Sequence, residues 1–180
     1  EAGLPAFGWN FPNVRLTAAF EQARAALPNL TTREIAVTAI DPGPEATRLT
    51  LADGTTLDTP LLVGADGKKS LIRASAAFRA RENAFTQSAL VCDLQLGRPI
   101  GAASIEFHYP EGPFTLVPAG EDRANLVWID DREVLRAAQA GGPEQLKAIF
   151  RDKSQRLFGS VELLTPTHIF PLSSITVDKA

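Results

Sequence analysis

Apolar residues recur along the chain with three spacings, and each spacing predicts a different kind of element. Between Val14 and Leu27 they recur every three or four residues, which indicates a helix that Asn13 would cap. Apolar and polar residues alternate on both sides of the turn dipeptide at 53–54, which predicts a β-hairpin. The wholly apolar run Leu61–Val63 is typical of a strand that is buried on both faces.

The stretch from residue 87 to residue 129 favours long strands. Apolar and polar residues alternate there between turns rich in glycine and proline, as expected of an antiparallel meander. The expected strands cover residues 87–96, 103–109, 114–118 and 125–129. Helices are expected next, from an acidic start at 130–133 and again over 143–158 up to Gly159, followed by a last strand over 162–171. This order predicts an α+β fold.

The composition is that of a globular protein. The 180 residues are 44% hydrophobic and 22% charged, and 18 basic residues against 21 acidic ones give a net charge of −3. No basic run occurs, so no nucleic-acid surface is expected. No apolar run approaches the roughly 20 residues that cross a bilayer, and a cytoplasmic protein is expected. The chain has no methionine and opens on Glu1, which is typical of a segment of a longer protein.

The segment that follows Leu61–Val63 carries the most specific chemistry. Gly64 and Gly67 stand on either side of Asp66, just before an expected helix start at Ser70. Glycine lets a ligand approach the backbone closely, a carboxylate accepts hydrogen bonds from ribose hydroxyls, and free N–H groups at a helix start can bind phosphate. The alternative is a tight turn in which Asp66 caps the helix without a ligand. Spacing alone leaves the two interpretations equal.

Other reactive side chains do not form a site in the sequence. His108 and His168 are far apart and lack a nearby cluster of metal-ligating residues, so no metal is expected. Cys92, the only cysteine, lies in an apolar stretch and is expected to pack inertly. The triphosphate-binding loop is excluded, because an extra lysine separates Lys68 from Ser70 and residue 62 is leucine where that loop needs glycine. No Gly-x-Ser-x-Gly elbow supports a hydrolase.

Residues 61–73 closely resemble the second flavin motif of class A flavoprotein monooxygenases, the para-hydroxybenzoate-hydroxylase-like group. The defining positions of that motif are all present, namely Gly64, Asp66, Gly67, Ser70 and Arg73. Residues 112–118 and 170–172 are similar to segments of the ubiquinone-biosynthesis hydroxylase branch. Two family features are absent from the sequence: the early Gly-x-Gly-x-x-Gly loop that holds the FAD pyrophosphate and a later Gly-Asp segment. The resemblance therefore predicts an internal fragment that binds FAD weakly or not at all.

The resemblance also implies a domain organisation and a set of site residues. It implies a partial α/β FAD-binding portion over residues 1–80, and an antiparallel or mixed substrate-binding sheet with flanking helices over 81–175. Asp66 and Gly67 would contact the ribose and pyrophosphate of FAD, and Arg73 would lie near the phosphates of the cosubstrate NAD(P)H. The substrate-side residues that it implies are Gly112, Pro113, Phe114, Leu116 and Pro118. Simple core packing is the alternative for Phe114 and Leu116.

The implied activity is hydroxylation of an aromatic ring with O₂ and NAD(P)H. The implied substrate is a prenylated quinone precursor of ubiquinone biosynthesis, and the fragment alone would be inactive. No residue stands out as a catalytic acid or base. The apolar substrates of this branch suggest peripheral association with an inner membrane. Two alternatives stay open: a free-standing domain that binds a ligand or partner without catalysis, and a related flavin reductase or halogenase.

Overall fold

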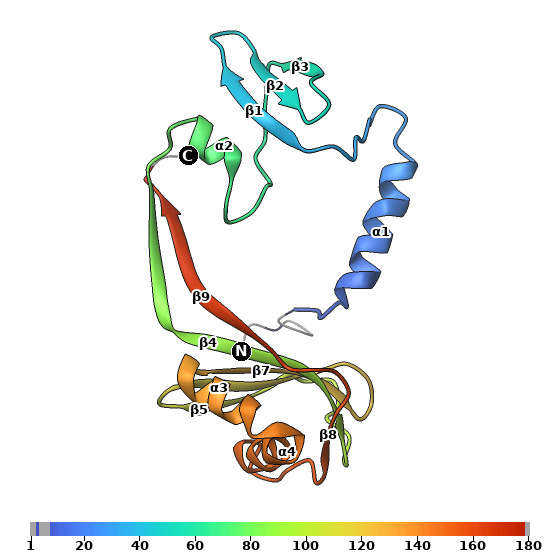
Figure 1. The fold of residues 1–180 in the computed structure, drawn as a ribbon. Helices are drawn as coiled ribbons and strands as arrows, with labels where there is room; N and C mark the ends of the chain where they lie inside the picture. Colours follow the sequence, from blue (N-terminus) through green and yellow to red (C-terminus); the bar gives the residue numbers. More distant parts are fainter. Residues whose placement is uncertain (1–2, 4–7, 179–180) are drawn as a thin grey trace. The chain divides into compact units, whose positions relative to one another are not determined.

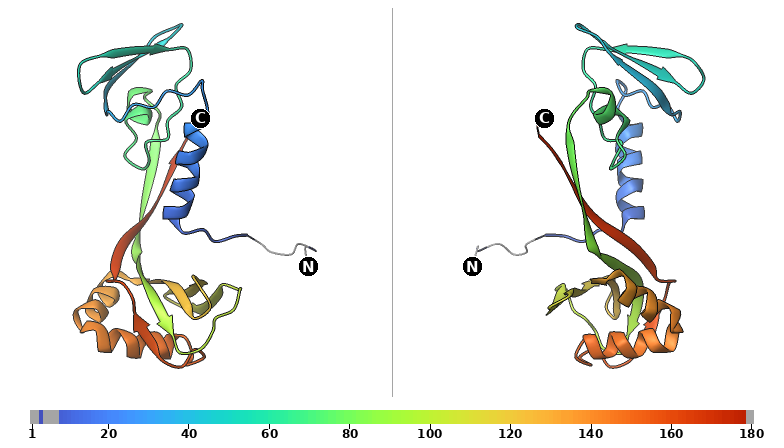
Figure 2. Two further views of the ribbon diagram at one scale, coloured as in Figure 1. Left: turned by 90° about the vertical axis from the view of Figure 1, so that its right-hand side faces the viewer. Right: turned by 60° about the vertical axis from the view of Figure 1, so that its left-hand side comes forward.

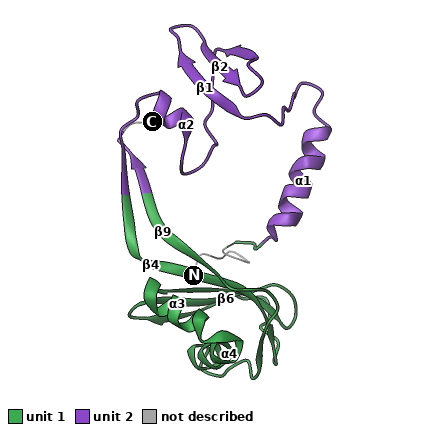
Figure 3. Ribbon diagram, in the orientation of Figure 1, with its two compact units in different colours: residues 1–10, 83–174 green, residues 11–82, 175–180 purple. Residues whose placement is uncertain are grey.

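The computed structural model describes residue 3 and residues 8–178, which belong to two compact units (Figure 3). Unit 1 comprises residues 1–10 and 83–174, and unit 2 comprises residues 11–82 and 175–180. The elements are drawn in Figure 1. In chain order they are α1 (Asn13–Ala25), β1 (Val37–Pro42), β2 (Thr47–Leu51), β3 (Thr56–Thr59), α2 (Leu71–Ser75), β4 (Ala80–Leu96), β5 (Ile105–Tyr109), β6 (Gly112–Pro118), β7 (Arg123–Asp131), α3 (Arg132–Ala140), α4 (Gly142–Lys153), β8 (Val161–Leu163) and β9 (His168–Val177).

Unit 1 is built on an antiparallel sheet with the strand order β5-β6-β7-β4-β8, and β9 also pairs with β4. The expected meander is therefore confirmed, together with the α+β class. The expected last strand over 162–171 is wrong as a single element, because β8 and β9 are separate strands. Thr165 lies between them, and its hydroxyl accepts a hydrogen bond from the backbone N–H of Asp93 at 2.9 Å.

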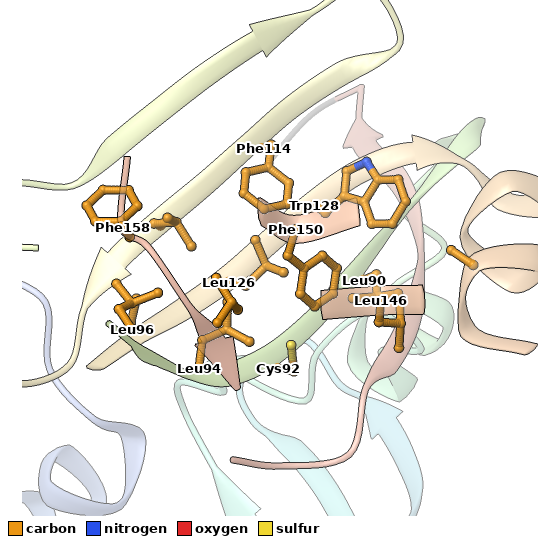
Figure 4. Close-up of a cluster of buried hydrophobic side chains, with 14 of the residues drawn as sticks. Leu90, Cys92, Leu94, Leu96, Phe114, Leu126, Trp128, Leu146, Phe150 and Phe158 are labelled. Carbon is orange, nitrogen blue, oxygen red and sulfur yellow. The ribbon is translucent and has the colours of Figure 1, made fainter. Parts of the chain in front are cut away.

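The core of unit 1 lies between this sheet and the helices α3 and α4, which cover one of its faces (Figures 1 and 2). Alternate side chains of β4, β6 and β7 point into it, as the two-residue period of a strand requires. At its centre Phe150 of α4 meets the rings of Trp128 and Phe114, with ring centroids 6.2 and 6.0 Å away (Figure 4). All three side chains have exposures of 1% or less.

Helices α3 and α4 differ from expectation only at their ends. Asp131 caps α3 by accepting the N–H of Glu133 at 2.9 Å, which agrees with the expected acidic start. The prediction that α4 continues to residue 158 is wrong. It ends at Lys153 because Gln155 and Arg156 adopt left-handed φ angles of 53° and 58°, which no helix can include. Within the described ranges, no helix has the length and apolar character needed to cross a bilayer.

Unit 2 contains the three-stranded antiparallel sheet β1-β2-β3 and the helices α1 and α2. The predicted hairpin is confirmed as β2-β3, and its turn is fixed by Asp53, whose carboxylate accepts the N–H and hydroxyl of Thr55 at 2.9 and 2.7 Å. Helix α1 is also confirmed. Its expected cap is wrong, because Asn13 is already helical and the N-cap position is Pro12, which makes no side-chain cap bond.

The expectation of a buried strand at Leu61–Val63 is wrong. These residues have no regular secondary structure, and the side chains of Leu61 and Val63 are each 75% exposed. Two local features oppose a strand. Pro60 has no N–H to donate, and the Thr59 hydroxyl bonds the carbonyl and N–H groups of Leu61 at 2.8 and 3.4 Å. Backbone groups that a ladder would use are thus engaged within the segment, and no described strand of unit 2 pairs with it.

Candidate functional site

The motif residues Gly64 to Arg73 form a loop that leads into helix α2, and Asp66 is its centre. The Asp66 carboxylate accepts the backbone N–H groups of Leu71 at 2.6 Å and Ile72 at 3.2 Å. A hydrogen bond with the Ser70 side chain and these backbone bonds hold the pKa of Asp66 below its ordinary value. Asp66 therefore caps the helix, as the alternative interpretation of the sequence had it, while its side chain stays on the surface.

The other motif residues complete the same local structure. Ser70 caps α2 by accepting the N–H of Arg73 at 3.0 Å, and the Arg73 guanidinium donates to the carbonyl of Lys68 at 2.6 Å. Gly67 has a φ of +78°, a left-handed conformation that a side chain would strain. Four of the five predicted cofactor residues are therefore brought together in one turn, and the fifth, Gly64, packs against the side chain of Ile72.

This geometry corrects one part of the sequence argument. The N–H groups at the start of α2 were expected to be free for a phosphate, but those of Leu71, Ile72 and Arg73 are taken by Asp66 and Ser70. What Asp66 retains is acceptor capacity, since a carboxylate has about four lone-pair positions. The loop fits a hydroxyl-bearing ligand such as a ribose or ribityl chain, with Asp66 as the acceptor and Gly67 leaving open space beside it.

An apolar cavity of about 330 Å³ lies beside this loop inside unit 2. Its lining consists of Val37, Ile40, Leu49, Leu62, Asp66, Lys69, Leu71 and Ile72. The charged side chains come only from the loop, and the apolar ones come from the sheet, Leu62 and α2. A ligand in this cavity could therefore bond Asp66 with a polar group while the apolar lining covers its apolar part.

The Asp66 cap is expected to weaken in acid. A folded pKa below the ordinary value of 3.8 means that the cap contributes fully at pH values above 3.8, and that its contribution is lost as the pH falls through the lowered folded value. Amide protection factors of Leu71 and Ile72, measured by hydrogen exchange, should fall over this range. In Asp66→Asn, which keeps an acceptor but does not titrate there, they should stay constant. Equal pH profiles for both proteins would refute this assignment.

The predicted substrate residues divide between two faces of the unit 1 sheet. Phe114 and Leu116 are 0% and 1% exposed and lie in the core, where Phe114 meets the rings of Phe107 and Phe150. Core packing, the alternative interpretation, describes both side chains here, and a substrate role for them stays a prediction that these contacts do not support. Pro113 is half-buried on the opposite face, and Pro118 is half-buried where β6 ends.

Gly112 is the first residue of β6, and the close approach of β7 leaves no room for a side chain at this position. A Cβ atom at this position would lie 2.6 Å from the carbonyl oxygen of Ile129, closer than any real contact. The rigid Gly112-Pro113 pair therefore lets β6 approach β7 tightly. This explains the pair structurally without requiring a ligand.

The face of the sheet opposite α3 and α4, here called the outer face, was missed by the sequence argument. Its half-buried side chains include Val91, Asp93, Pro113, Thr115, Val117, Asn125, Val127 and Ile129. The amide of Asn125 donates to the carboxylate of Asp93 at 2.9 Å. Strict two-residue alternation could have revealed it, because Phe114 and Leu116 cannot share a face with Thr115.

Cys92 and His108 both have ordinary structural surroundings. Burial raises the pKa of the Cys92 thiol to about 12, which leaves it protonated and unreactive at neutral pH. His108 is exposed beside Glu106, with the imidazole nitrogen 3.2 Å from the carboxylate. Among the residues that the structure describes, no three His, Cys, Asp or Glu side chains are grouped as metal ligands would be.

No protein-family model matches the chain, but relatives of known activity do. It is 33% identical over 110 residues to ubiquinone hydroxylase UbiL of Rhodospirillum rubrum, covering 61% of the chain and 25% of that relative. It is 29% identical over 149 residues to 3-demethoxyubiquinol 3-hydroxylase of Escherichia coli, covering 82% of the chain and 38% of that relative. The chain thus spans between a quarter and two fifths of the length of these two proteins.

Solved structures give the same fold. A structure of PqsL from Pseudomonas aeruginosa in complex with 2-aminobenzoylacetate superimposes with a TM-score of 0.68 at 23% identity, over 88% of this chain and 45% of that one. PqsL is described as a probable FAD-dependent monooxygenase. The flavin-dependent halogenase CmlS superimposes with a TM-score of 0.66 at 17% identity, over 92% of this chain and 31% of that one.

Proposed function

We propose that this chain, which is similar to hydroxylases of ubiquinone biosynthesis, forms part of a class A flavoprotein monooxygenase, an FAD-dependent enzyme that hydroxylates an aromatic quinone precursor. The relatives carry this proposal, because both are named as hydroxylases of ubiquinones or their precursors. It is a proposal for the whole enzyme, of which the chain corresponds to a part. The apolar strand at 61–63, on which the sequence argument rested, contributes nothing to it.

Unit 2 would supply part of the flavin site. The Asp66 carboxylate, held ionised by its hydrogen bonds, would accept a hydroxyl of the FAD ribose or ribityl chain, and Gly67 would let the cofactor approach the backbone. The guanidinium of Arg73, which donates one N–H to Lys68, keeps further donors for a phosphate of NAD(P)H. When bound, FAD supplies the redox chemistry that activates O₂ after reduction by NAD(P)H.

Unit 1 would hold the aromatic ring of the substrate against its outer face. The apolar side chains of Val91, Val127 and Ile129 would cover the ring and exclude water, while Thr115 and the Asp93–Asn125 pair offer hydrogen bonds to its oxygen atoms. This replaces Phe114 and Leu116, which point the other way, as the proposed contacts. An apolar prenylated substrate would also draw the enzyme to a membrane surface.

Neither alternative from the sequence gains support. The halogenase likeness is at 17% identity and concerns the fold alone. A binding module without catalysis would have to arise within a group whose named relatives are hydroxylases.

The proposal is tested on the complete product of the gene that encodes this sequence. It should purify yellow with FAD, and a phenolic quinone precursor should stimulate its consumption of NAD(P)H and O₂. Asp66→Ala should weaken FAD binding about tenfold or more, the effect of losing a hydrogen bond to a charged group. Glu45→Ala, an exposed acid in a loop of the same unit, is the matched control. A colourless product that consumes no NAD(P)H would overturn the proposal. The 180-residue chain alone should bind FAD weakly or not at all, and tight stoichiometric binding would contradict that expectation.

A further inference from the structure

Unit 1 contains a second cavity, of about 540 Å³, on the helix-covered side of its sheet. It lies among α3, α4 and the end of β7, and its size is typical of small-ligand sites. Its lining consists of Glu111, Trp128, Asp130, Val134, Ala137, Ala138, Gln145, Ile149 and Lys153. It lies on the other side of the sheet from the outer face.

Asp130 and Lys153 form an ion pair in the lining of this cavity, and both charged side chains are largely buried. The side chains of Asp130 and Lys153 are only 5% and 20% exposed, and the ammonium nitrogen lies 3.6 Å from the carboxylate. Asp130 is otherwise satisfied, because it accepts the Trp128 indole N–H at 3.0 Å and the N–H of Asp131 at 2.8 Å. The carboxylate therefore has little need of Lys153 as a donor.

Lys153 by contrast has donors to spare. At 3.6 Å its contact with Asp130 is longer than the roughly 2.8 Å of a charge-assisted hydrogen bond. The ammonium is held in place by the rings of Tyr109 and Trp128, whose centroids lie 4.3 and 4.9 Å away and which accept no directed N–H bond. A positioned cation with unused N–H groups at an apolar cavity is complementary to an acceptor oxygen.

The charges of the lining select among possible ligands. Lys153 is offset by Asp130, and Glu111 adds a second negative charge, so an anion would be repelled. The aliphatic side chains of Val134 and Ile149 suit the hydrocarbon part of an apolar ring. We propose that this cavity binds a neutral, flat carbonyl compound of the quinone class, with one carbonyl oxygen accepting a hydrogen bond from Lys153. The proposal needs no flavin and stands independently of the hydroxylase function.

The test uses duroquinone, a fully substituted quinone that does not arylate amines, on the 180-residue chain carrying Trp9→Phe. Trp128 is then the only tryptophan, and its emission should be quenched saturably. Durene, which has the same flat tetramethylated six-carbon skeleton without carbonyl groups, should displace duroquinone only at about tenfold higher concentration, the effect of losing one hydrogen bond to a charged group. Equal affinities for durene and duroquinone, or quenching that does not saturate, would overturn the proposal.

Two variants add a second line of proof. Asp130→Asn with Lys153→Met removes the ammonium without leaving a lone buried charge, and should abolish the preference for duroquinone over durene. Lys147→Met, on the same helix but bonded to Glu144 and Glu162 outside the cavity, should leave the preference intact. If the double variant still prefers duroquinone over durene, duroquinone does not bind through Lys153 in this cavity, and the proposal is wrong.

Discussion

Replacing Phe150 with alanine is expected to lower the unfolding free energy of unit 1 by about 3–5 kcal/mol, the range for large aromatic truncations in a packed core. Phe150 is fully buried and joins helix α4 to the sheet through the rings of Phe114 and Trp128 (Figure 4). Its removal would leave a cavity between two layers that no single neighbour can refill. Such a loss is a large part of the about 5–15 kcal/mol by which domains are stable.

Urea unfolding, followed by the emission of buried Trp128 in a Trp9→Phe background, measures this change. Phe150→Leu should cost clearly less, because most of the volume is kept. Phe85→Ala is the matched control, since that phenylalanine of β4 is 48% exposed and should change stability by less than about 0.5 kcal/mol. Similar losses for Phe85→Ala and Phe150→Ala would show that α4 and the sheet are not held by this cluster.

Elements with local signals could be predicted from sequence. The hairpin β2-β3 was predictable because Asp53 and Gly54 favour a tight turn whatever surrounds them, and Asp53 does fix it with its own side chain. The meander of unit 1 was predictable for the same reason, since each strand alternates and each turn carries glycine or proline. Ends were less predictable. The composition of residues 143–158 did not indicate that Gln155 would adopt a left-handed conformation and end the helix.

Features that depend on partners distant in sequence were not predictable. The run Leu61–Val63 is apolar enough for a buried strand, but a strand needs a neighbour to bond, and no described strand of unit 2 pairs with it. Phe114 and Leu116 were predicted either to line a substrate pocket or to pack in the core, and both lie in the core. Whether their face of the sheet would be covered depended on where α3 and α4 pack, and those helices pack on that face.

The candidate flavin site combines a feature that the sequence could predict with one that it could not. Its residues Asp66, Gly67, Ser70 and Arg73 lie close together, because all belong to one turn and helix start. The sequence could not show that the capping bonds of Asp66 and Ser70 would take the N–H groups meant for a phosphate. Capping and ligand binding use the same residue types, so only the geometry separates them.

Asp130→Ala is expected to destabilise unit 1 by about 3–5 kcal/mol, as much as the loss of Phe150, although the side chain is small and polar. Asp130 is the common partner of Trp128, Asp131 and Lys153 at the end of β7. Without it, an ammonium that is only 20% exposed loses its counter-charge, and the buried indole N–H loses its acceptor. Chemical unfolding of the variant measures this loss of stability. Asp131→Ala, which removes the exposed cap of α3, is the comparison variant and should lower the unfolding free energy by only about 1 kcal/mol.

A double-mutant cycle separates the charge from the hydrogen bonds. Asp130→Asn keeps an acceptor for Trp128 but leaves Lys153 unpaired, so it should remain strongly destabilising on its own. Adding Lys153→Met removes the orphaned charge and should recover most of that stability, because a buried ion pair contributes little beyond its own desolvation cost. If the two single losses simply add in the double variant, Lys153 does not depend on Asp130. The ammonium would then be stabilised by the aromatic rings of Tyr109 and Trp128 alone.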